Sequence, residues 1–322
     1  MKKKTLPEVG HTPLVLVEGV YAKLECVNPC GSIKDRIARY IFEESENRGW
    51  LKPGMTIVEA TSGNTGIAMS YFAREMGYPI TIIMPENMTG ERKAIMRNLG
   101  ANLILCSEKG SFQEAASIRD SMAENPTYFN PDQFSNPLNV ECHNKTTGQE
   151  IIAALKQSDI KPDALVAGVG TGGTLIGIGK ALREINPSLY IVAVEPAESA
   201  VMSGGEAGTH GIPGIGDGFI PAIASDGKDG LHPLIDDVST IPSDEAREAA
   251  LNLKEKHGYC VGISSGANFL AARRLQNRYP VVVTVFADGY FRYQSNGLCH
   301  CKESQCEFED ARYDALKAAG IT

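Results

Sequence analysis

One lysine lies in a turn of small residues that opens a predicted helix, an arrangement suited to attack on a carbonyl group. The turn, called the lysine turn below, is Asn-Pro-Cys-Gly-Ser-Ile-Lys-Asp-Arg at 28–36, and the lysine is Lys34. The positive end of the helix is expected to lower the pKa of this amine. Only a neutral amine forms a Schiff base, so Lys34 is a candidate nucleophile. A solvated surface lysine is the ordinary alternative.

A second loop has the composition of a carboxylate site. This substrate loop, Thr-Ser-Gly-Asn-Thr-Gly at 61–66, follows a predicted buried strand at 55–60 and precedes a predicted helix at 67–76. Hydroxyls, an amide and free backbone N–H groups at a helix N-terminus suit a carboxylate. An ordinary capped turn is an equally good interpretation of this segment alone.

A third loop is rich in glycine and suits a phosphate. This phosphate loop, Gly-Val-Gly-Thr-Gly-Gly-Thr at 168–174, follows a predicted strand at 164–167. It also matches G-x-G-x-x-G, with Glu195 near the spacing of a ribose-binding acid, so a dinucleotide site is a competing prediction. That alternative leaves Lys34 and the substrate loop without a role. A lysine, a carboxylate loop and a phosphate loop together suit pyridoxal phosphate.

The elements around these loops predict an α/β fold of two lobes. Short apolar runs alternate with amphipathic segments along most of the 322 residues, which indicates mostly parallel, twisted sheets covered by helices. We expect the break between the lobes near 131–145 and the site at the carboxyl ends of the strands.

Composition excludes several classes of protein. The net charge is −8, which argues against a nucleic-acid or anionic-membrane surface. No apolar run reaches membrane-spanning length, and the basic start lacks the apolar segment of a signal peptide, so we expect a cytoplasmic protein. The eight cysteines are then expected to be reduced thiols or metal ligands.

The chain resembles the cysteine synthase (O-acetylserine sulfhydrylase) and cystathionine β-synthase family of fold-type II pyridoxal-phosphate enzymes. The resemblance runs from about Thr12 to Tyr293 and rests on a set of motifs in order. These are the lysine turn, the substrate loop, Met-Pro-Glu-Asn-Met at 84–88, Gln-Phe-Ser-Asn-Pro at 133–137, Thr-Thr-Gly at 146–148, the phosphate loop, Gly-Ile-Gly at 214–216 and Gly-Ile-Ser-Ser-Gly-Ala at 262–267.

The resemblance implies a fold like that of the tryptophan synthase β chain, and a homodimer. It implies a smaller, mobile domain at 36–140 that carries the substrate loop. A larger domain, formed by 1–35 and 141–298, would hold the phosphate of the cofactor, and 299–322 would be a cysteine-containing tail.

The resemblance also implies roles for single residues. Lys34 would form the Schiff base and act as acid and base at the substrate Cα, and Asn64 would contact the 3′ oxygen of the cofactor. The remaining cofactor residues would be Gly170, Thr171, Gly172, Gly173, Thr174 and Gly289. The substrate-binding residues would be Thr61, Ser62, Gly63, Thr65, Gln133 and Gly216.

The implied reaction is β-replacement, in which acetate leaves O-acetylserine, or a similarly activated serine, to give an aminoacrylate that sulfide converts to L-cysteine. Cystathionine β-synthase activity and cysteine desulfhydration by β-elimination are alternatives. An alternative of another class is a regulatory protein that senses thiols or a metal.

Three features depart from the family pattern, of which the first is a shorter segment than usual between 12–15 and 22–25. Gly289 replaces a serine that often faces the pyridine nitrogen of the cofactor, so no hydroxyl is available there. The tail carries Cys299, Cys301 and Cys306, which, with Cys26 and Cys30, are candidate ligands of zinc or an iron–sulfur cluster. Reduced thiols without a metal are the alternative.

Overall fold

The computed structural model describes residues 6–61, 63–86, 88, 90–107, 112–228, 230–289, 293 and 298. These residues divide into two compact units. The first unit comprises 6–9 and Asn28–Asp132, and the second comprises Gly10–Val27 and the described residues from Gln133 onward. The division into a smaller, mobile domain at 36–140 and a larger domain formed by 1–35 and 141–298 stays a prediction.

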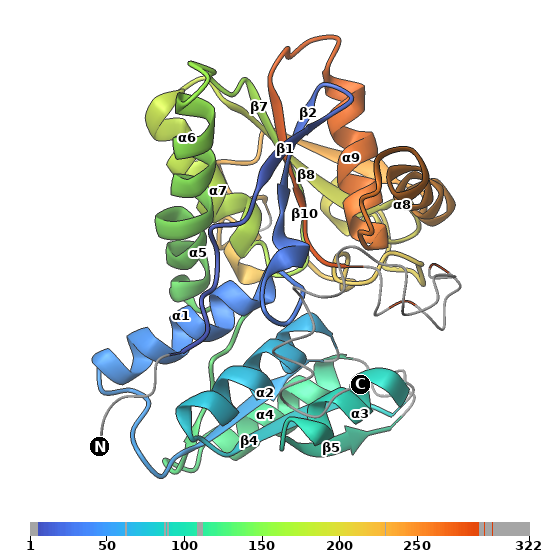
Figure 1. The fold of residues 1–322 in the computed structure, drawn as a ribbon. Coiled ribbons are helices and arrows are strands. Elements are labelled where there is room, and N and C mark those ends of the chain that lie inside the picture. The colour runs from blue at the N-terminus through green and yellow to red at the C-terminus, as the bar shows by residue number, and fades with distance from the viewer. Residues whose placement is uncertain are drawn as a thin grey trace. The chain divides into compact units, whose positions relative to one another are not determined.

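The first unit is built on a four-stranded parallel sheet with the order β5-β4-β3-β6 (Figure 1). Its strands are β3 (Thr56–Ala60), β4 (Ile80–Pro85), β5 (Asn102–Cys106) and β6 (Tyr128–Phe129), and its helices are α1 (Lys34–Asn47), α2 (Asn64–Met76), α3 (Gly90–Asn98) and α4 (Phe112–Ala123). The sequences of β3 and β4 are mostly apolar, because the side chains of these strands are buried on both faces of the sheet.

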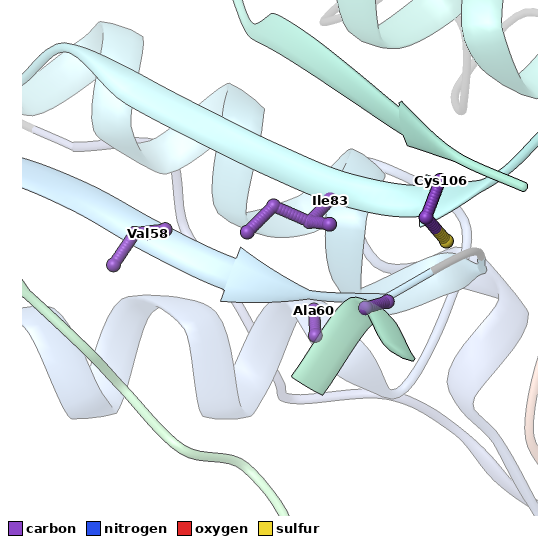
Figure 2. Close-up of a cluster of buried hydrophobic side chains, with 5 residues drawn as sticks. Val58, Ala60, Ile83 and Cys106 are labelled. Carbon is purple, nitrogen blue, oxygen red and sulfur yellow. The ribbon is translucent and has the colours of Figure 1, made fainter. Parts of the chain in front are cut away.

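A small apolar cluster fixes the strand that leads into the substrate loop. Val58 and Ala60 of β3 lie beside Ile83 of β4, and Cys106 lies at the end of β5 (Figure 2). All four side chains are buried. Close packing of this kind resists displacement, so the end of β3 gives the substrate loop a rigid base.

The second unit contains a six-stranded sheet with the order β1-β2-β10-β7-β8-β9. Its strands are β1 (Leu14–Val17), β2 (Val20–Leu24), β7 (Ala164–Gly168), β8 (Tyr190–Pro196), β9 (Asp237–Ile241) and β10 (Val282–Phe286). Its helices are α5 (Pro137–His143), a π-helix η2 (Asn144–Gly148), α6 (Gln149–Lys156), α7 (Gly173–Ile185), α8 (Ser243–His257) and α9 (Ile263–Leu275), with short 3₁₀ turns η1 (Glu25–Val27), η3 (Ala197–Ser199), η4 (Val201–Ser203) and η5 (Ala222–Ala224).

The predicted fold class is confirmed, because both sheets are mostly parallel and carry helices. The exception is the β1–β2 hairpin, whose strands are antiparallel. Its two-residue turn has positive φ at both Glu18 and Gly19, as tight hairpins require. The segment between α5 and α6 is the π-helix η2, which continues directly into α6. No helix within the described ranges is long and apolar enough to span a membrane.

Candidate active site

The lysine turn is held by hydrogen bonds before and after the lysine. Gly31 has φ of +76°, and its N–H donates to the carbonyl of Asn28 at 2.7 Å. The backbone N–H of Cys30 donates to the carboxylate of Asp35, which is fully buried. Lys34 is the first residue of α1. The backbone from which its side chain projects is therefore fixed on both sides.

Helix α2 brings a buried phenol close to this turn. Burial, followed by the nearby Cys30, Glu75 and Asp35, raises the pKa of Tyr71. The phenol therefore stays protonated at neutral pH. Because α2 also begins at the substrate loop, the lysine turn and the substrate loop belong to the same unit.

The substrate loop lies where β3 ends and α2 begins. The N–H of Thr61 donates to the carbonyl of Ile83 at 3.0 Å, and Gly63 is the N-cap residue of α2. Asn64 and Thr65 therefore occupy the first helical turn, whose N–H groups lack acceptors within the helix. A Cβ on Gly66 would lie 2.8 Å from Sδ of Met96 and 3.1 Å from the methyl carbon of Thr61, so a larger residue there would require these side chains to shift. Ser62 lies outside the described residues.

The phosphate loop has the same arrangement in the second unit, between β7 and α7. A Cβ on Gly170 would lie 2.4 Å from the carbonyl oxygen of Gly214, and Gly172, the N-cap residue of α7, has φ of +87°. A side chain is thus excluded at Gly170 and disfavoured at Gly172, and the N–H groups of the first turn of α7 lack acceptors within the helix. The positive end of the 13-residue helix α7 favours an anion at this place.

The structure also describes three other predicted residues of the second unit, Gly216, Gly289 and Gln133. The N–H of Gly216 donates to the carbonyl of Val169 at 3.0 Å, which places Gly216 beside the phosphate loop. Gly289 pairs with Val261 in an antiparallel bridge just before α9. Gln133 is buried, with 3% of its surface exposed.

The structure argues against the dinucleotide alternative, because the acid that would bind a ribose, Glu195, already has hydrogen-bond partners. Glu195 is buried, and its two carboxylate oxygens accept hydrogen bonds from the N–H of Met202 at 2.8 Å and from the N–H and hydroxyl of Ser203 at 2.9 and 2.6 Å. The carboxylate therefore stabilises the short turn η4. It is not available to a ribose.

Sequence reasoning missed two polar side chains that contact the phosphate loop. Asn139 donates to the hydroxyl of Thr171 at 3.0 Å, and Nε2 of His143 lies 3.4 Å from the hydroxyl of Thr174. Both side chains are fully buried on α5. Their i, i+4 spacing was the available signal, because it places both on one face of a helix.

The structure describes two of the five cysteines that were predicted as metal ligands. Cys26 and Cys30 are buried and are not disulfide-bonded. Among the described residues, no cluster of three or more His, Cys, Asp or Glu side chains is arranged to hold a metal ion. Cys299, Cys301 and Cys306 lie outside the described residues, so their role stays a prediction, which elemental analysis for zinc and iron would test.

Known proteins match this chain over most of its length. The family model described as pyridoxal-phosphate dependent enzyme matches residues 5–288. A cysteine synthase of Staphylococcus aureus is 40% identical over 301 residues, which cover 90% of this chain and 94% of that protein.

Two solved structures are also similar. A hydrogen sulfide-producing enzyme from Fusobacterium nucleatum has a TM-score of 0.84 at 38% identity, covering 94% of this chain and 92% of that one. An O-acetylserine dependent cystathionine β-synthase from Helicobacter pylori has a TM-score of 0.83 at 36% identity, covering 90% and 96%.

Proposed function

Because this chain belongs to the family of pyridoxal-phosphate dependent enzymes, we propose that it makes L-cysteine by β-replacement on O-acetylserine, or a similarly activated serine, with sulfide. The relative named cysteine synthase, 40% identical over nearly the full length of both chains, carries this proposal. The proposed reaction requires that the substrate lose its Cα proton, that its carboxylate be bound and that Cβ carry a leaving group.

The residues present fit pyridoxal phosphate. Gly170 and Gly173 exclude side chains from the phosphate loop, since a Cβ on Gly173 would lie 1.9 Å from Oδ1 of Asn139. Backbone amides, the hydroxyls of Thr171 and Thr174 and the N-terminus of α7 are donors suited to a phosphate dianion. When bound, pyridoxal phosphate supplies an electron sink for the negative charge that develops at Cα.

We assign the steps at the substrate to the first unit and to Gln133. Lys34 would hold the cofactor and accept the proton of the substrate Cα through Nζ. Thr61, Gly63 and Thr65, with Ser62 and Gln133, would bind the α-carboxylate. Asn64 would orient the cofactor through its 3′ oxygen. The rigid end of β3 supports this assignment, because a fixed carboxylate places the Cα–H bond at a constant distance from the base.

Purified protein incubated with O-acetylserine and sulfide tests the proposal. We expect cysteine to form in wild type and in Lys52→Ala, whose lysine is exposed, but not in Lys34→Ala. Reduction with borohydride and peptide mass spectrometry should place the cofactor on Lys34. Cystathionine from serine and homocysteine, or sulfide from cysteine alone, with no cysteine formed, would replace the proposed reaction by one of the alternatives. Absence of bound cofactor would favour the regulatory alternative.

A homodimer and a cytoplasmic location complete the proposal. The homodimer is supported by the family resemblance, and sedimentation of the holoenzyme tests it. The location is supported by buried cysteines that are not disulfide-bonded, which suit a reducing compartment. These are Cys26, Cys30, Cys106, Cys142 and Cys260. Cell fractionation tests it.

A further inference from the structure

Asn139 connects two parts of the candidate site within the second unit. Its side chain is fully buried, and Nδ2 donates to the carbonyl oxygen of Gln133 at 2.8 Å and to the hydroxyl oxygen of Thr171 at 3.0 Å. The carbonyl oxygen only accepts, so the amide nitrogen must face it. Both hydrogens of Nδ2 are therefore used, one on each partner.

These contacts determine the direction of the Thr171 hydroxyl. A hydroxyl has two acceptor lone pairs and one hydrogen. One lone pair of Thr171 accepts from Asn139, and the other faces the N–H of Gly173 at 3.4 Å. With both lone pairs occupied, the hydroxyl must give its hydrogen to a third group. Among the described residues Thr171 has no acceptor for it.

The remaining atom of the amide explains the glycine in the loop. Oδ1 of Asn139 is buried and has no hydrogen-bond partner among the described residues. It would lie 1.9 Å from a Cβ on Gly173, so Gly173 and Asn139 are matched in shape. An apolar or larger side chain at either position would move the loop or break the contact with Thr171.

We propose that Asn139 is a positioning residue that makes Thr171 a hydrogen-bond donor toward a phosphate. This inference rests on the proposed function, because it concerns the same phosphate loop. A phosphate dianion accepts hydrogen bonds and donates none, so a hydroxyl with a fixed outward hydrogen binds it without first having to reorient. The same amide holds the carbonyl of Gln133, so the residue that binds the phosphate and the segment that binds the substrate carboxylate share one anchor.

Titration of the cofactor-free protein with inorganic phosphate and with pyridoxal phosphate tests the inference. Loss of one hydrogen bond to a charged group should weaken binding of each about tenfold or more, both in Asn139→Ala and in Thr171→Val. The double variant should bind about as weakly as Thr171→Val alone, because Asn139 acts through that hydroxyl. Thr171→Ser keeps a hydroxyl and should bind nearly as well as wild type. Gln157→Ala, an exposed amide at the end of α6, is the matched control.

The outcomes separate the two proposals. Additive losses in the double variant, or wild-type phosphate affinity in Asn139→Ala, would overturn the role of Asn139. A merely structural role would lower the thermal midpoint of the cofactor-free protein without this dependence on Thr171. Wild type that binds phosphate but makes no cysteine would reject the proposed function and leave the inference standing. Wild type that binds neither ligand would reject both.

Discussion

At the scale of single residues, the phosphate loop requires positions that carry no side chain. Glycine at 170 and at 173 leaves room for the carbonyl of Gly214 and for Oδ1 of Asn139. The G-x-G-x-x-G pattern alone fits a dinucleotide equally well. The hydrogen bonds of Glu195 to Met202 and Ser203 distinguish the two, because they occupy the acid that a ribose would need.

Gly173→Ala tests this steric argument. The new methyl group would overlap Asn139, whose surroundings are close-packed, so the loop must shift. We expect at least a tenfold loss of affinity for pyridoxal phosphate, measured by absorbance titration of the cofactor-free protein. Gly90→Ala is the control, since no atom lies within 4 Å of its added Cβ. Equal affinities in the two variants would contradict the argument.

At the scale of elements, an ion-pair network links α4 to β3, the strand that leads into the substrate loop. Arg119 of α4 lies 3.3 Å from the buried carboxylate of Glu59, 2.8 Å from Asp120 and 3.4 Å from Asp132. Burial lowers the pKa of Arg119, but these carboxylates outweigh it and raise the pKa overall. The guanidinium therefore stays charged. Glu59 also accepts from the N–H of Ala60, one residue before the substrate loop begins.

Arg119→Met should destabilise the protein by about 3 kcal/mol, because it removes a cation from the buried carboxylate of Glu59. Denaturation in urea measures this loss. The matched control is Arg97→Met on α3, where the arginine is exposed and the change should cost less than about 0.5 kcal/mol. Equal midpoints for the two variants would show that the network does not stabilise the unit. Glu59→Gln in the Arg119→Met background should recover part of the loss.

At the scale of the whole molecule, pH acts on stability through groups that differ between the folded and unfolded chain. Burial, followed by the charges of Lys180 and Arg183, lowers the pKa of His232 from its ordinary value of 6.5. The folded protein therefore keeps this imidazole neutral at a pH where the unfolded chain has already bound a proton. Its contribution to stability is present above pH 6.5 and is lost as the pH falls below that value.

His232→Gln should therefore flatten the decline in stability on the acid side of pH 6.5. Thermal midpoints measured between about pH 7.5 and 5 check this, since the titration of one histidine spans roughly two pH units. His257→Gln is the comparison, because Nε2 of His257 lies 3.0 Å from a carboxylate oxygen, that of Glu18. A decline in His232→Gln as steep as in wild type would reject the assignment.

Sequence alone determined the α/β class, the loops after the strands and the candidate lysine, because these are written in short, local patterns. A run of β-branched residues, a glycine loop and a helix start lie within about 20 neighbouring positions. The tertiary structure decided the contacts between residues that are far apart in the sequence. Asn139 meets Thr171 across 32 residues, and Arg119 meets Glu59 across 60. Such contacts depend on which elements pack together, so the direction of a hydroxyl and the use of Glu195 could be read only from the folded chain.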